Sequence, residues 1–237
     1  MSLGLAAFLA FRPDPDRTPT RVSLSGSVRA GAGCAALGPC EAVALAPVFL
    51  EPGWLEGLSH VQRRYFVTSR APVWQLTRTL PAGKHTFRVE VDGAVYGAGG
   101  RPDGPPLEFD LDAPRPVTFL YSADRHAVMA DAAEPVVVAS GDFQHALGCA
   151  GDFDDGCLHS WLQDVDGDGR YTLSTRLIPV GTWQVRPAVR PAGPPPVTTR
   201  FVVKRRAEEV LLVWRPGNQQ VVVEFPERPA PVPGEAE

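Results

Sequence analysis

The chain has little lysine and no excess of positive charge. Its 237 residues include 23 lysines and arginines against 27 aspartates and glutamates, a formal net charge of −4. Lys84 and Lys204 are the only lysines. This balance excludes a broad electrostatic attraction to nucleic acid or to an anionic membrane. The basic run at 204–206 is typical of a solvated strand or loop face.

Catalytic motifs are also missing. The sequence has no GxSxG, no Walker loop, no HExxH pair and no dinucleotide fingerprint. Its 5 histidines are scattered without the spacing of a metal site. We therefore predict a non-catalytic protein that carries no cofactor.

No apolar run is long enough to cross a bilayer, which needs about 20 residues. Residues 3–11 are apolar apart from Gly4, but they lack the basic start and the cleavage site of a signal peptide. Either a signal remnant or an interfacial tether fits this composition. We predict peripheral contact with a protein partner or a membrane surface through five side chains: Leu3, Leu5, Phe8, Leu9 and Phe11.

Helical patterns are scarce. The 25 prolines and 23 glycines separate short runs of β-branched and aromatic residues, which is the pattern of strands joined by turns. Such runs occupy 21–28, 85–91, 116–121, 135–140, 182–189, 200–203, 209–214 and 220–225. Only 52–66 has helical spacing. We predict an all-β protein of two tandem immunoglobulin-like antiparallel β-sandwiches.

Two parts of the chain share the same short motifs in the same order. Ser25-Gly26 and Gly33-Cys34 match Ser140-Gly141 and Gly148-Cys149 at one constant offset. LPAG at 80–83 matches IPVG at 178–181, and 117–128 matches 210–221 without a gap. A repeat of roughly 100 residues fits a duplicated domain. We predict a first half at 19–133 with an insertion at about 46–70, a second half at 134–226, an N-terminal segment at 1–18 and a proline-rich tail at 227–237.

The four cysteines form two close pairs, Cys34 with Cys40 and Cys149 with Cys157, at the same place in each half. A zinc site would need tighter CxxC spacing or nearby histidines. We predict two local disulfides, and therefore an extracytoplasmic location in the periplasm or at the cell surface. Four reduced thiols are the alternative in a cytoplasmic protein.

An acidic turn lies between two predicted strands. Asp164, Asp166 and Asp168 stand at alternate positions before a glycine, as at the start of a calcium loop. The twelfth position is Thr175, where an EF-hand needs a bidentate glutamate. Ordinary hairpin-turn chemistry explains the pattern better, and weak calcium binding stays open.

The sequence from GDFQHALGC to GTWQV, at 141–185, resembles the starch-binding β-sandwich modules that accompany bacterial pullulanases and amylopullulanases. The first half resembles the other part of that module through LPAGKHTFRVEV, YGAGGRPDGPPLEFDL and VTFLYSADRHAV. The resemblance covers about 19–226. It implies a non-catalytic fold whose relatives bind α-glucans.

The chain departs from this family at its sugar-stacking residues. Tyr96-Gly97 match, but Asp92 and Val95 stand where the family usually has Trp and Asn. The second half has no Tyr-Gly there, and Phe153 replaces the tryptophan of the family's GDW. Trp74 and Tyr96 remain as candidate glycan-binding residues. Three other tryptophans alternate with apolar residues and are expected in the core: Trp161, Trp183 and Trp214.

Two functions fit these observations. The first is a structural or scaffolding subunit that docks on a membrane-associated protein complex, and the sequence favours it because the stacking residues are incomplete. Its contact surface would join the N-terminal segment to four residues of the insertion: Trp54, Arg63, Arg64 and Tyr65. The alternative is an α-glucan-binding protein that acts without an attached hydrolase.

Overall fold

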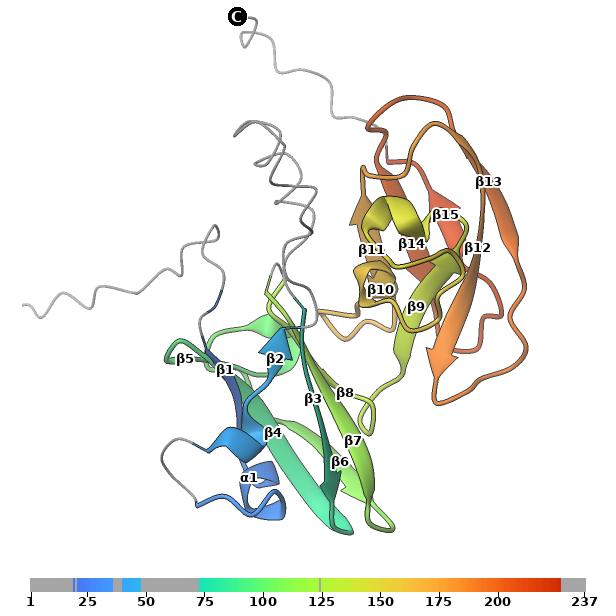
Figure 1. The fold of residues 1–237 in the computed structure, drawn as a ribbon. Coiled ribbons are helices and arrows are strands. Elements are labelled where there is room, and N and C mark those ends of the chain that lie inside the picture. Colours follow the sequence, from blue (N-terminus) through green and yellow to red (C-terminus); the bar gives the residue numbers. More distant parts are fainter. Residues whose placement is uncertain (1–18, 20, 36–39, 48–72, 124, 227–237) are drawn as a thin grey trace, which may run out of the picture.

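A computed structural model describes residues 19, 21–35, 40–47, 73–123 and 125–226. These residues form antiparallel strands joined by turns and very short helices (Figure 1). The predicted all-β class is confirmed. The helical pattern at 52–66 and the predicted docking residues at 3–11 and 54–65 lie outside the described residues.

The first half contains two four-stranded sheets. In one sheet β4 pairs with three strands; its members are β1 (Val22–Ser25), β4 (Gly83–Val91), β5 (Ala94–Tyr96) and β6 (Leu107–Leu111). The other has the order β2 (Ala46–Pro47), β3 (Val73–Leu80), β7 (Arg115–Ser122), β8 (Ala127–Ala130). Short helices lie between strands: α1 (Val28–Gly31), η1 (Glu41–Val43) and η3 (Ala98–Gly100).

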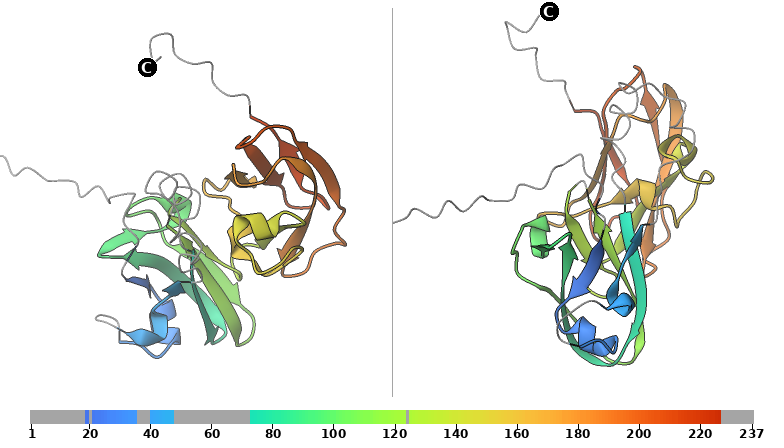
Figure 2. Two further views of the ribbon diagram at one scale, coloured as in Figure 1. Left: turned by 45° about the horizontal axis from the view of Figure 1, so that its top comes forward. Right: turned by 60° about the vertical axis from the view of Figure 1, so that its left-hand side comes forward.

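The second half contains a four-stranded and a three-stranded sheet. The first has the order β10 (Trp161–Leu162), β9 (Val136–Gly141), β12 (Gly181–Arg190), β13 (Thr199–Val203). The second has the order β11 (Tyr171–Thr175), β14 (Val210–Trp214), β15 (Val222–Glu224). Two short helices, η4 (Gln144–Leu147) and η5 (Leu158–Ser160), follow β9. Among the described strands, no sheet combines the two halves (Figure 2).

Each half has its own hydrophobic core because the strands alternate. In β7, Val117, Phe119 and Tyr121 all have no exposed surface and point into the core of the first half. In β9, Val137 and Ala139 point into the core of the second half. Trp214 belongs to this second core, and Trp183 packs against it half-buried, as the alternation predicts.

A third apolar cluster joins the two halves. It is formed by residues on the opposite faces of the same strands, where Leu120 and Met129 meet Val138 and Trp161. Trp161 is therefore buried as predicted, with 1% of its surface exposed, but between the halves rather than inside one of them. Arg125 adds a polar contact, since its guanidinium donates to the Thr172 hydroxyl at 3.2 Å.

Strand pairing follows the same register in both halves. The pairs at corresponding places are Ser25–Arg88 and Ser140–Arg186, Gly83–Leu111 and Gly181–Val203, Trp74–Tyr121 and Tyr171–Trp214, and Phe119–Ala130 and Leu212–Val223. One member of each pair lies in a segment that the sequence repeat aligns: Ser25 with Ser140, Gly83 with Gly181, Tyr121 with Trp214, and Phe119 with Leu212. The correspondence therefore extends from short motifs to individual strand pairs.

Candidate functional site

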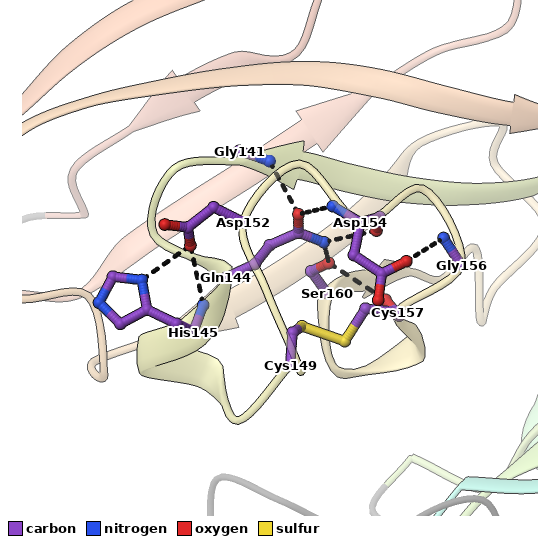
Figure 3. The surroundings of a disulfide bond; sticks show 9 residues. All are labelled: Gly141, Gln144, His145, Cys149, Asp152, Asp154, Gly156, Cys157 and Ser160. Atoms are coloured by element: carbon purple, nitrogen blue, oxygen red, sulfur yellow. Dashed lines mark hydrogen bonds and ion pairs between the residues drawn. A yellow bond between two sulfur atoms is a disulfide. The ribbon is translucent and has the colours of Figure 1, made fainter.

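The connection between β9 and β10 forms a loop that a disulfide closes (Figure 3). Cys149 and Cys157 are bonded, and so are Cys34 and Cys40 in the first half. Both predicted disulfides are confirmed, and they account for all 4 cysteines of the sequence. The disulfides support an extracytoplasmic location.

Gln144 fixes the path of this loop from inside (Figure 3). Its side chain has no exposed surface. Its oxygen accepts hydrogen bonds from the backbone N–H of Gly141 at 3.1 Å and of Asp154 at 2.8 Å. Its nitrogen donates to the Asp154 carbonyl and to the Ser160 hydroxyl, both at 2.9 Å. Every hydrogen-bonding position of the amide is used, so the loop is held in one arrangement.

His145 and Asp152 fasten the outer side of the loop. The Asp152 carboxylate lies 2.7 Å from His145 Nδ1 and accepts a second hydrogen bond from the His145 backbone at 3.1 Å. Desolvation opposes ionisation of Asp152, but the two hydrogen bonds outweigh it and lower the pKa of this carboxyl. Asp152 therefore carries its negative charge at neutral pH. Trp183 lies beside His145, with its indole N–H bonded to the Pro179 carbonyl at 2.8 Å.

This framework presents Phe153 to solvent. The residue has a positive φ of 54°, and its N–H donates to the Gly141 carbonyl at 3.0 Å. Its side chain stays 40% exposed although it is a large apolar ring. The Arg186 guanidinium lies 5.8 Å from the ring centroid and pairs with Asp155 at 3.2 Å. An exposed ring beside a paired cation and carboxylate can stack on one face of a ligand and hydrogen-bond its edge.

Trp74 and Tyr96, the predicted glycan-binding residues, are buried in the core of the first half. Trp74 is 7% exposed and Tyr96 only 1%. The Tyr96 ring stacks on His126, with the ring centroids 4.3 Å apart. Burial does not favour a stacking role for either ring, because neither presents a face to solvent.

The acidic turn brings its three carboxylates together. One oxygen from each of Asp164, Asp166 and Asp168 lies within 4.8 Å of the others. Asp164 accepts three backbone N–H groups, from Gly167, Asp168 and Gly169, at 2.9–3.1 Å. These bonds provide the structural role that the turn interpretation predicts. The predicted role is that of a turn, and weak calcium binding is the alternative that the sequence left open.

The sequence pointed to only part of the surface around Phe153. Phe153 stood out because it replaces the tryptophan of GDW. Arg186, in contrast, is far away in the sequence and carries no motif. Its proximity depends on the register in which β12 pairs with β9, where Arg186 lies opposite Ser140.

The matched family covers this whole surface. Residues 136–191 match the sequence pattern described as the Pullulanase X25 domain. This segment resembles the pullulanase X25 domain. The matched residues extend from β9 to the end of β12 and include the disulfide loop, Phe153 and Arg186. The predicted resemblance to pullulanase modules is confirmed for this segment.

Other comparisons add less. The solved pullulanase from Bacillus acidopullulyticus is 19% identical over 65% of this chain and 16% of that chain, with a TM-score of 0.33. This chain therefore spans a small part of that pullulanase. A search of the curated proteins found no match. Within the described residues, none of the helices has the length and apolar character needed to cross a bilayer.

Proposed function

We propose that the protein is a non-catalytic extracytoplasmic module that binds α-glucan through Phe153 and the Arg186–Asp155 pair. One observation carries the proposal. The exposed Phe153 ring and its charged neighbours lie in the segment that matches the pullulanase X25 domain. The sequence favoured the scaffolding function because the stacking residues are incomplete. We now place glycan binding first, because Phe153 is exposed to solvent and lies beside Arg186.

The geometry suits a sugar for two reasons. The C–H face of a glucose ring can pack on the Phe153 ring, while its hydroxyl groups bond to the guanidinium and the carboxylate. The disulfide and Gln144 hold the loop before any ligand arrives, which lowers the ordering cost of binding. A single exposed ring supports weak binding, and we expect a Kd near the millimolar range, about 4 kcal/mol.

We further propose that the chain is a tandem duplication of one immunoglobulin-like β-sandwich, with the halves at 19–133 and 134–226. The corresponding strand registers and the two disulfides at corresponding places support this proposal. The corresponding cysteine loop of the first half, 34–40, has no aromatic residue in its sequence. The two halves would therefore have different roles, with the second half carrying the ligand.

Affinity electrophoresis in gels that contain soluble starch tests the function. Starch should retard the wild-type protein, and Phe153→Ala should lose most of the retardation, about tenfold in affinity. Phe225→Ala is a matched control, since Phe225 is also 40% exposed but lies outside the matched segment. A wild-type protein that starch, glycogen and maltooligosaccharides all fail to retard would contradict the proposal.

Docking on a membrane-associated complex is the second candidate, and the apolar sequence at 3–11 favours it. Burial of three or four such side chains would contribute roughly 5–8 kcal/mol before ordering costs. Deletion of residues 1–11 should then release the protein from its membrane fraction while both halves stay folded. Unchanged co-fractionation would argue against docking through this segment.

A further inference from the structure

One strand of the first half has no counterpart in the second. In the first half, β5 pairs with residues 89–91 of β4 and carries Tyr96, whose ring is buried. That ring stacks on His126 and lies 6.1 Å from the Tyr121 ring, measured between centroids. The edge of β4 is therefore covered, and the space beside Tyr121 is filled by an aromatic side chain.

The same register identifies the corresponding place in the second half. Residues 187–189 of β12 correspond to 89–91, and Trp214 corresponds to Tyr121. The connection to the next strand is shorter, 191–198 rather than 92–106, and these described residues contain no strand. Within the described residues, β9 and β13 are the only strands that pair with β12, and neither covers the outer edge of residues 186–190.

A groove of about 440 Å³ lies at this place. Its apolar walls come from β12, the shortened connection and Trp214, and include Pro187, Val189, Pro194 and Pro196. Its polar groups are Asp155, Arg186, Arg190 and Asn218. Mostly apolar walls with a few placed polar groups are typical of small-molecule sites, and this volume lies within the usual range of roughly 300–1,000 Å³.

The groove is continuous with the Phe153 surface. Asp155 and Arg186 line the groove, and Arg186 is also the cation that lies over the Phe153 ring. A ligand stacked on Phe153 and extended past Arg186 would enter the groove directly. An oligosaccharide fits this combination, because it is a chain of ring-shaped units with apolar faces and polar edges.

We propose that the groove is a second subsite, so that the protein binds a stretch of α-glucan chain rather than a single glucose unit. This inference rests on the proposed function. One sugar unit stacks on Phe153, Arg186 and Asp155 bond to hydroxyl groups at the junction, and the following units lie against the proline and valine walls. Affinity therefore increases with chain length until the groove is full.

Calorimetry with maltose, maltotriose, maltopentaose and maltoheptaose tests the groove. Wild-type affinity should increase at least tenfold from maltose to maltoheptaose. Gly193→Phe should abolish this increase and keep maltose binding, because Gly193 lines the groove. An added Cβ at Gly193 meets only Val189 Cβ, at 4.0 Å, so the substitution fits the backbone. Ala192→Phe, at another exposed lining position, is the second variant if the first does not fold.

The control is Thr182→Phe, which adds the same ring at an exposed position of β12 that does not line the groove. It should keep the wild-type length dependence. Phe153→Ala should weaken binding at every length. A folded Gly193→Phe protein that keeps the full length dependence overturns the groove but leaves the proposed function intact. No binding of any oligosaccharide by the wild type overturns both.

Discussion

Gln144 and Arg29 occupy the same position of the two aligned halves, and each holds a cysteine loop from inside. The Arg29 guanidinium donates two hydrogen bonds to the Ala35 carbonyl, at 3.1 and 3.2 Å. Gln144 instead reaches across its loop to both backbone groups of Asp154. Because Gln144 bonds the residue next to Phe153, it acts as a positioning residue for the exposed ring.

The first prediction concerns Gln144→Ala. The substitution leaves the buried Ser160 hydroxyl without this partner and frees two backbone N–H groups and one carbonyl. We expect the free energy of unfolding to fall by about 2–4 kcal/mol in urea titrations. Gln220→Ala, at an exposed position, should change it by less than about 0.5 kcal/mol. Equal losses in the two variants would contradict the role of Gln144.

At the scale of elements, the sequence predicted the strands that carry a clear alternation. Each of the eight predicted runs contains a strand, and β9 and β12 match their runs to within one residue at each end. The eight runs leave out the other seven described strands: β2, β3, β5, β6, β8, β10 and β11. Among these, β11 has the mostly polar sequence YTLST and follows the acidic turn. That strand is defined by its pairing with β14 rather than by its own pattern. Register is likewise a tertiary property, so the sequence could not place Arg186 beside Phe153.

The second prediction separates the two disulfides. Replacing both Cys149 and Cys157 with serine should reduce the free energy of unfolding by about 2–3 kcal/mol, and the same change at Cys34 and Cys40 should cost a similar amount. Only the first variant should also weaken starch binding, because only its loop presents Phe153. Equal retention of starch binding in the two folded variants would show that the loop does not need its disulfide to hold the ring.

The connection between the halves contains an acid with an unusual environment. The Glu134 carboxylate accepts a hydrogen bond from the Tyr171 hydroxyl at 3.3 Å. Desolvation raises the pKa of Glu134 to about 7, the Tyr171 hydrogen bond opposes the rise, and the Asp164 charge adds to it. Glu134 is therefore largely protonated in the folded protein at pH 6, whereas it is ionised in the unfolded chain.

The third prediction follows from this difference. The raised pKa means that the Glu134 carboxyl binds its proton more tightly in the folded state than in the unfolded chain. The stabilisation from this proton is fully present below about pH 4.5 and is lost as the pH rises through about 7. The free energy of unfolding should fall over this range by on the order of 2 kcal/mol, with allowance for solvent screening. Glu134→Gln should flatten that slope in urea titrations at several pH values. The exposed control Glu108→Gln should keep it. An unchanged slope in Glu134→Gln would contradict the assignment.

At the scale of the whole molecule, the two halves pack through unlike faces. The first half contributes Val73, Leu120, Ala127 and Met129. The second half contributes Val136, Val138, Leu158 and Trp161, with Ala188 packed against them. If the halves are copies of one module, each half has two such faces: the one that it uses in this contact, and a counterpart of the face that the other half uses. In a head-to-tail contact of this kind, one face of each half stays unused. If both unused faces were apolar, molecules could associate through them into open filaments.

The two unused faces are more polar than the two faces in contact, when residues at corresponding positions of the halves are compared. Arg170 and Gln220 replace Val73 and Ala127 on one face, while Val213 and Val222 stay apolar. On the other face the counterparts are Arg21, Ser23, Glu41, Ala44 and Glu90. Arg170 is also engaged in an ion pair with Glu224 at 2.8 Å. Burial of these charges in a further contact would be costly, so we expect these two faces not to associate with each other.

The last prediction restores the apolar faces. One variant carries Arg170→Val and Gln220→Ala, and a second carries Arg21→Val, Glu41→Leu and Glu90→Ala. Each alone should stay monomeric in sedimentation velocity, because its new face has no complementary partner. An equimolar mixture should form a discrete one-to-one complex, and a chain with all five substitutions should form longer, concentration-dependent assemblies. Self-association of either partial variant alone would indicate non-specific hydrophobic association. A mixture that stays monomeric would mean that the faces of the two halves are not interchangeable. It would contradict the idea that the two halves pack through corresponding faces of one duplicated module.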